Sequence, residues 1–224
     1  MSDLLVYGPH ILVGAAALFF FWRTLLTVKG SAPHRRNGRR YLLLLVPLLA
    51  TTVLFALQAL AVEGPVRVVQ LVYLVLVVAA AGWTAWRAIR DRATPERFTG
   101  PGFRALAVGL TGMGVLLMVM GIVTGQVLPF GFAMIGVVYG GAMLGQIGRP
   151  LRGGWWLGWH LNGVALLFAA THASFVGLVL RHLVPAWEGE VLHALTQLGT
   201  IAFAYGLRQA LGWRYEGRGL PVVA

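Results

Sequence analysis

Apolar residues occur along this chain in long, nearly uninterrupted runs rather than in alternating or amphipathic patterns. Each run holds about 20 residues or more, which is the length that an α-helix needs to cross the hydrocarbon core of a bilayer. Glycine and proline occupy most of the joints between the runs. The pattern predicts an all-α integral membrane protein whose residues 1–224 form a single domain of seven transmembrane helices. The predicted spans are about 5–28, 41–62, 66–88, 103–124, 127–147, 155–180 and 190–212.

The composition supports this prediction and excludes several other classes of protein. Hydrophobic residues make up 58% of the chain, charged residues only 11%, and the mean hydropathy is +0.77. Soluble domains are about one quarter charged, so a soluble enzyme, a disordered tail and a fibrous repeat are excluded. The chain has no cysteine, which excludes disulfides, thiolate nucleophiles and iron–sulfur clusters.

Basic residues gather on one side of the predicted membrane. Of the 18 Lys and Arg residues, only Arg67 and Arg181 fall on the other side. The positive-inside rule therefore predicts an N-terminus outside and a C-terminus inside, in the cytoplasmic (inner) membrane. A cleaved signal peptide is disfavoured, because Asp3 precedes the first run and no basic segment does. Orientation and contact with anionic lipids at the inner face explain the net charge of +11, so no nucleic-acid partner is expected.

Residues that could move ions or protons are scarce inside the spans. All acidic residues lie near span ends or in loops, and no predicted span contains a lysine. A carboxylate proton relay and a retinal Schiff base are therefore disfavoured. A channel or carrier would have to use Gln58, Gln70, Asn162 and Gln197, which are too few to define a path.

Histidines are the remaining candidates for cofactor chemistry. The predicted topology places His34 and His160 toward the inner face, His172 at mid-depth and His10 toward the outer face. A b-type haem is held by two imidazoles from different helices at equal depth. The candidate partner of His160 is His34, if the basic loop before the second span folds back. The alternative is that these rings make only ordinary hydrogen bonds at span ends and in a loop.

A second group surrounds the predicted outer loop before the last span. It consists of His182, Glu188, Glu190 and His193. Imidazole and carboxylate together suit zinc, copper or iron, so this group is a candidate metal site. The alternative is that a short loop holds such residues simply because it faces water.

The first third of the chain and the sixth span carry a recognisable pattern. HILVG at 10–14, KG at 29–30 and HRRNGRRY at 34–41 resemble a family of uncharacterised bacterial multi-pass membrane proteins, with a His-x3-Gly first helix and a K-G-x3-H-R-x2-G-R loop. WH at 159–160 and AATHASF at 169–175 are similar to a later helix of that family. The resemblance implies a bacterial membrane protein but no activity. A more distant similarity to two-haem membrane cytochromes implies haem and electron transport by analogy of fold.

The motif also contains a candidate anion site at the inner membrane surface. Arg35, Arg36, Arg39 and Arg40 surround Gly38, where a turn is expected. Arginine forks bind phosphate and carboxylate oxygens. The loop could therefore hold a lipid headgroup, a haem propionate or an anionic partner, or it could serve only as the topology signal.

Glycines four residues apart predict close packing of the fourth and fifth spans as a hairpin, or alternatively a dimer face. The pairs are Gly121 and Gly125, Gly136 and Gly140, and Gly141 and Gly145. Two classes of function remain open. One is a histidine-ligated haem or metal redox protein. The other is a non-catalytic protein, either an accessory or structural subunit of a larger membrane complex or a binder of lipids or small molecules.

Overall fold

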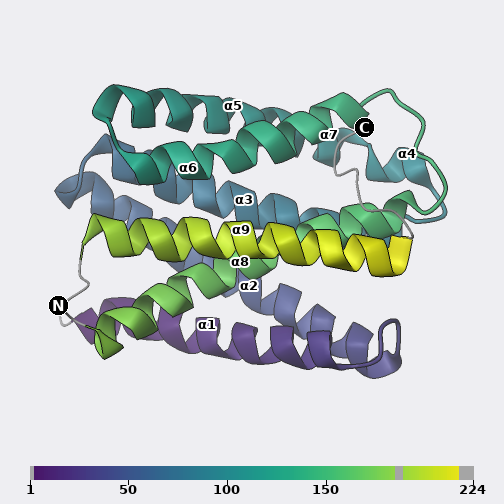
Figure 1. Cartoon of the computed structure of the whole chain (residues 1–224), viewed down its shortest axis with the longest axis horizontal. Coiled ribbons are helices and arrows are strands. Elements are labelled where there is room, and N and C mark those ends of the chain that lie inside the picture. The colour runs from purple at the N-terminus through teal and green to yellow at the C-terminus, as the bar shows by residue number, and fades with distance from the viewer. Residues whose placement is uncertain (1–2, 185–188, 217–224) are drawn as a thin grey trace. The chain divides into compact units, whose positions relative to one another are not determined.

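A computed structural model describes residues 3–184 and 189–216, and every regular element in those ranges is a helix (Figure 1). Six stretches in this part of the chain are long and apolar enough to cross a membrane. They belong to α1 (Asp3–Leu26), α2 (Ala32–Val62), α3 (Pro65–Arg90), α5 (Pro101–Thr124), the continuous run of α6 (Val127–Ile135), η1 (Gly136–Gly140) and α7 (Gly141–Gln146), and α8 (Trp155–Leu183). The all-helical prediction is confirmed, and the helices are those of a multi-pass membrane protein.

The remaining elements are the short α4 (Pro95–Phe98) and the C-terminal α9 (Glu190–Glu216). α9 covers the predicted seventh span and has 27 residues, which is long enough to cross a bilayer. It does not reach the apolar composition of the other six. The seventh span and the orientation of the termini therefore stay predictions.

Contacts divide the chain into two compact units, Met1–Val75 and Leu76–Ala224, with the boundary inside α3. The prediction of one domain over the whole chain stays a prediction.

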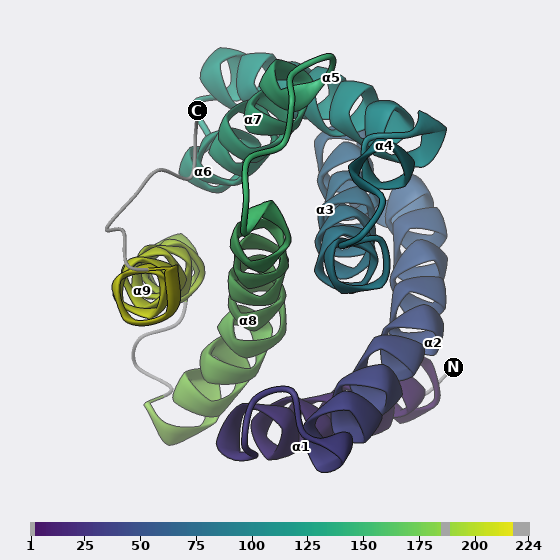
Figure 2. The same ribbon diagram turned by 90° about the vertical axis from the view of Figure 1, so that its right-hand side faces the viewer.

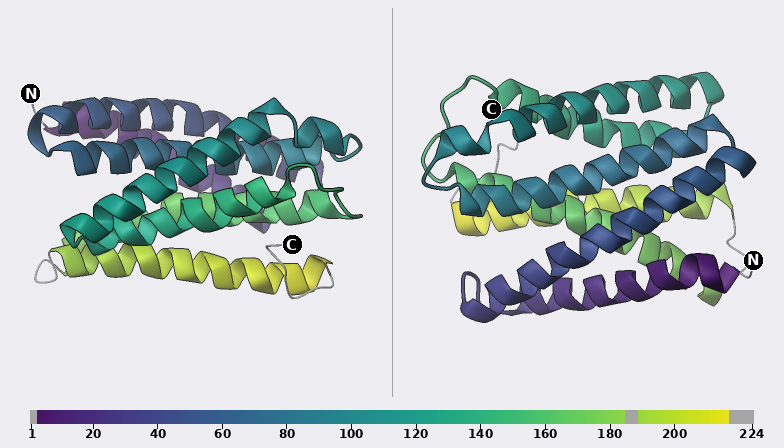
Figure 3. Two further views of the ribbon diagram at one scale, coloured as in Figure 1. Left: turned by 90° about the horizontal axis from the view of Figure 1, so that it is seen from above. Right: turned by 180° about the vertical axis from the view of Figure 1, so that it is seen from behind.

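In the first unit, α1 and α2 form an antiparallel hairpin with a short turn (Figure 3). Ser31 is the N-cap of α2, and its hydroxyl accepts a hydrogen bond from the backbone N–H of His34 at 3.3 Å. Pro33 occupies the first turn, where its missing N–H costs nothing. These two local signals start α2 at Ala32 rather than at residue 41. The prediction of a basic loop with a turn at Gly38 was therefore wrong, and the motif is helical.

In the second unit, α5 packs against the run from α6 to α7 (Figure 2). Gly125 makes the turn, because it caps α5 in the left-handed region with a φ of 68°. Built Cβ atoms at Gly114 and Gly121 would lie 3.0 Å from Gly136 Cα and 2.7 Å from Phe130 N. Such short distances mean that the two backbones approach closely, so the predicted hairpin is confirmed at Gly121 and Gly136. Built Cβ atoms on the other predicted glycines Gly125, Gly141 and Gly145 would have nothing within 4 Å, so these three do not take part in the close packing.

Aromatic rings fill one end of the second unit. Phe98 of α4 is fully buried, and its ring centroid lies 4.7 Å from that of Trp155 and 5.0 Å from that of Phe103. Trp83 and Trp159 also contact it, at 5.7 and 5.8 Å. α4 thus anchors the loop between α3 and α5 to the start of α8 through ring contacts.

Candidate functional site

The turn between α1 and α2 carries a dense set of cations, here called the basic end. All its members are exposed: Arg23, Lys29, Arg35, Arg36, Arg39 and Arg40. The sequence contains no acidic residue between Asp3 and Glu63. The positive charge of the basic end is therefore not neutralised by any neighbour in the sequence.

Most of these cations are held by the hairpin itself. Lys29 donates to the carbonyl of Leu25, and Arg35 donates to that of Gly30. The guanidinium of Arg40 lies over the ring of Phe20, 5.4 Å from its centroid. These contacts fix the direction of the side chains but do not cancel their charge.

Arg36 and Arg39 differ from the others. Within the described residues, neither side chain makes a hydrogen bond, an ion pair or a ring contact, and both are exposed. Each guanidinium therefore keeps its full set of N–H donors for an external anion.

His34 and Asn37 lie beneath these arginines on α2. His34 Nδ1 is 3.0 Å from the carbonyl oxygen of Thr24, which ties the first turn of α2 to the last turn of α1. Asn37 is 3% exposed, and its Nδ2 has no hydrogen-bond partner in the described part of the chain. A buried amide donor without an acceptor is costly to stability.

The candidate haem ligands are bonded through Nδ1. His10 Nδ1 lies 2.8 Å from Thr51 Oγ1, His160 Nδ1 lies 2.7 Å from the carbonyl of Ala85, and His172 Nδ1 lies 2.9 Å from that of Phe168. A carbonyl oxygen can only accept, so Nδ1 carries the proton in His160 and His172, as in His34, and Nε2 carries the lone pair. That tautomer is the one used by most histidines that bind metals through Nε2.

The predicted outer metal group is only partly within the described residues. Glu188 and the side chain of Glu190 lie outside them. His182 Nδ1 is 2.9 Å from the carbonyl of Leu178, and His193 Nε2 is 2.7 Å from a guanidinium nitrogen of Arg181. Across residues 3–184 and 189–216, no three His, Asp or Glu side chains gather in a way that could hold a metal ion. The metal site stays a prediction.

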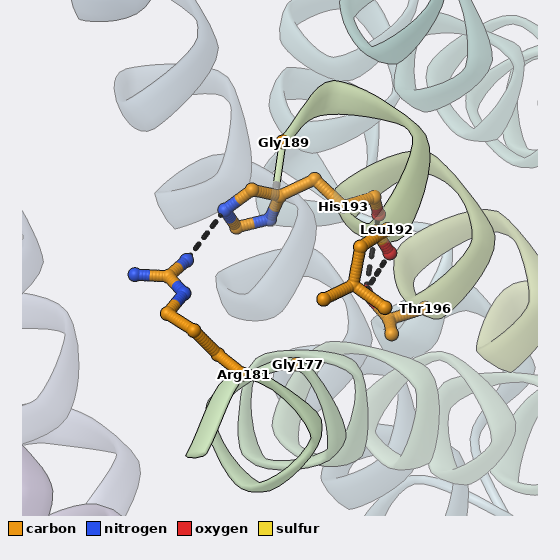
Figure 4. A pocket seen from close by; sticks show the side chains of 6 residues that line it. All are labelled: Gly177, Arg181, Gly189, Leu192, His193 and Thr196. Atoms are coloured by element: carbon orange, nitrogen blue, oxygen red, sulfur yellow. Dashed lines mark hydrogen bonds between the residues drawn. The ribbon is translucent and has the colours of Figure 1, made fainter. Parts of the chain in front are cut away.

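A cavity of about 180 Å³ lies beside Arg181 and His193, between the end of α8 and the start of α9 (Figure 4). It is lined by Gly177, Arg181, Gly189, Leu192, His193 and Thr196. Sequence reasoning found His193 but did not find Arg181 as its partner. The two residues are adjacent only because α8 and α9 pack side by side. In the sequence, Arg181 is notable only as one of the two arginines predicted on the outer side.

Two buried polar pairs inside the second unit were also missed. Thr84 Oγ1 and the Tyr139 hydroxyl are 2.7 Å apart, and Arg208 Nε donates to Asn162 Oδ1. Thr84, Asn162 and Arg208 are at most 7% exposed. Asn162 was considered for a carrier path, but the structure shows it engaged with a neighbouring helix. These pairs join α3 to η1 and α8 to α9.

Together, the six helices that are long and apolar enough to cross a membrane indicate a helical multi-pass membrane protein. No protein-family model, curated protein or solved structure matches the chain.

Proposed function

We propose that this chain is a seven-pass protein of the bacterial inner membrane, with its N-terminus outside and its C-terminus inside. We further propose that it is a non-catalytic protein that binds anionic lipid headgroups at the inner face through its basic end. The observation that carries the proposal is the set of exposed cations at one turn, in a segment without acidic residues.

The position of the basic end suits headgroups rather than a soluble anion. Its cations follow the apolar stretch of α1 and precede that of α2, so they lie where lipid phosphates meet water. A basic side chain near an anionic surface contributes about 1 kcal/mol. Arg36 and Arg39, which have no partner among the described residues, should therefore contribute about 2 kcal/mol together, or roughly 30-fold in preference.

Native mass spectrometry of the detergent-purified protein tests this preference for anionic lipid. The protein is exchanged into micelles with equal amounts of phosphatidylglycerol and phosphatidylcholine, and the retained lipids are counted. We expect preferential retention of phosphatidylglycerol, and a loss of most of that preference in Arg36→Gln/Arg39→Gln. The matched control is Arg149→Gln/Arg152→Gln, which removes two exposed arginines between α7 and α8. Equal retention of the two lipids, or an equal effect of both double variants, would overturn the proposal.

The topology can be tested directly because the chain has no cysteine of its own. Single cysteines are introduced at Gln126, Gly153, Val191 and Arg214, and intact cells are treated with an impermeant maleimide. We expect labelling at Gln126 and Val191 only, with the other two reacting after permeabilisation. Labelling at Arg214 in intact cells would show that α9 does not cross the membrane.

A second candidate function is electron transfer through b-type haem. It is favoured by the Nδ1–H tautomer of His160 and His172, whose Nε2 atoms carry the lone pairs that haem iron requires. Bound haem would supply one-electron chemistry. The test is the visible spectrum of protein expressed with added haem, oxidised and then reduced with dithionite. Sharp reduced bands that disappear in His160→Ala or His172→Ala would support it, and a colourless protein would exclude it.

A further inference from the structure

The cavity between α8 and α9 lies at the ends of these two helices that the predicted topology places outside, and no residue of the basic end lines it. We propose that this cavity binds a small anionic group, a carboxylate or a phosphate, through the guanidinium of Arg181 beside His193. The site is independent of the proposed inner-face function.

The contact between Arg181 and His193 defines the chemistry of the cavity. A guanidinium can only donate, so Arg181 donates to His193 Nε2 across 2.7 Å, and the imidazole is the neutral acceptor (Figure 4). A guanidinium has five N–H donors, and a neutral ring satisfies one of them without balancing the charge. An anionic oxygen is the partner that would do both.

Arg181 is one of only two Lys or Arg residues that the predicted topology places on the outer side of the membrane. The only other cation predicted there, Arg67, has a carboxylate partner, because its Nε lies 3.2 Å from Glu63. Among the side chains that the structure describes, Arg181 has no such partner. Within the described side chains, the two arginines predicted outside therefore differ in the feature that an anion site needs.

The start of α9 also favours the binding of an anion in the cavity. Gly189 and Leu192, at the first turn of this 27-residue helix, line the cavity. The first turn of a helix presents backbone N–H groups and the positive end of the helix dipole. The cavity thus joins a guanidinium to a helix N-terminus, and both favour negative charge.

The floor of the cavity depends on a glycine. Gly177, Leu192 and Thr196 are buried, and a Cβ on Gly177 would already lie in van der Waals contact with Thr196 Oγ1, at 3.4 Å. A larger side chain at residue 177 would occupy the cavity itself. Gly177→Val therefore tests the space without altering any charge.

Isothermal titration of the full-length protein in a neutral maltoside detergent, with inorganic phosphate and with acetate, tests the proposal. We expect saturable binding that weakens about tenfold or more in Arg181→Gln, because a charge-assisted hydrogen bond is lost. Gly177→Val should weaken binding as well, and the matched control Arg67→Gln should not. If Arg181→Gln does not fold, as judged by size-exclusion chromatography, Gly177→Val carries the test.

A second arm separates a lipid from a free anion. The same variants are compared for retention of phosphatidylglycerol over phosphatidylcholine. Loss of retention in Arg181→Gln without binding of free phosphate or acetate would assign the site to a lipid headgroup. Neither kind of binding, or binding that Arg181→Gln and Gly177→Val leave unchanged, would overturn the proposal. Saturable binding of Zn²⁺ that is lost in His193→Ala, without anion binding, would overturn it in favour of a metal site.

Discussion

Gly140 and Gly141 are adjacent in the chain, yet their surroundings differ. A Cβ on Gly140 would lie 2.5 Å from Thr111 Oγ1 and 2.9 Å from Thr111 N, whereas a Cβ on Gly141 would have nothing within 4 Å. Gly140→Ala and Gly141→Ala are therefore a matched pair that adds one methyl group at the same depth of the same hairpin. We expect the first to destabilise the protein and the second to leave it unchanged or more stable.

The magnitude follows from the distances. The Thr111 hydroxyl can rotate away, but its backbone nitrogen can move only if α5 shifts. Ordinary contact begins at 3.4 Å, so the backbones must separate by about half an ångström, and overpacking of this kind costs about 1–3 kcal/mol. Alanine favours a helix over glycine by about 1 kcal/mol. Gly140→Ala should therefore lose up to about 2 kcal/mol of unfolding free energy, and Gly141→Ala should gain up to about 1 kcal/mol.

The assay is reversible unfolding in mixed micelles, followed by circular dichroism as the fraction of denaturing detergent rises. The free energies of unfolding of the two variants are compared with that of the unaltered protein under the same conditions. If Gly140→Ala is as stable as Gly141→Ala, the close approach of α5 and η1 does not exist. If Gly141→Ala is instead the destabilised variant, Gly141 faces a second protein surface, such as the dimer face considered from the sequence.

Three further predictions use the same assay. Thr84→Val should lower the free energy of unfolding by about 1–3 kcal/mol, because it leaves the buried Tyr139 hydroxyl without its partner. Adding Tyr139→Phe to this variant should recover part of that loss. If the losses of the two single variants simply add, the pairing is contradicted. Asn162→Leu should lower the free energy of unfolding by about 3 kcal/mol, because it removes an acceptor from the buried guanidinium of Arg208. Asn162→Asp keeps an acceptor there and should not cause this loss. Gly163→Ala should cost more than either glycine variant above, because its Cβ would lie 2.5 Å from a backbone oxygen of α3.

Part of the basic motif could have been placed more accurately from the sequence. The expected loop at residues 29–40 ignored Ser31 and Pro33, which together form a helix start. Hydropathy marks where a helix enters the membrane, not where it begins. A single glycine does not end a helix, and Gly38 lies inside α2, where a Cβ built on it would be in van der Waals contact with Thr24 Cγ2 at 3.5 Å. The arginines therefore lie on the surface of a helix and not in a loop.

The long apolar stretches were determined by the sequence itself. A span must satisfy its backbone within one segment and cover it with apolar side chains, so its presence can be recognised from local composition. The glycine spacing likewise predicted the packing of α5 against α6 and η1, because close approach of two helix backbones requires small residues wherever they touch.

The partners of the polar residues were decided only by the tertiary structure. His160 binds a carbonyl of α3, Arg208 binds an amide of α8, and Arg181 meets His193 across the ends of two helices. Each pair joins residues from different helices, and the sequence shows only that each is polar. The physical reason is that membrane insertion depends on the properties of one segment, whereas hydrogen bonds between helices depend on the rotation and depth of both.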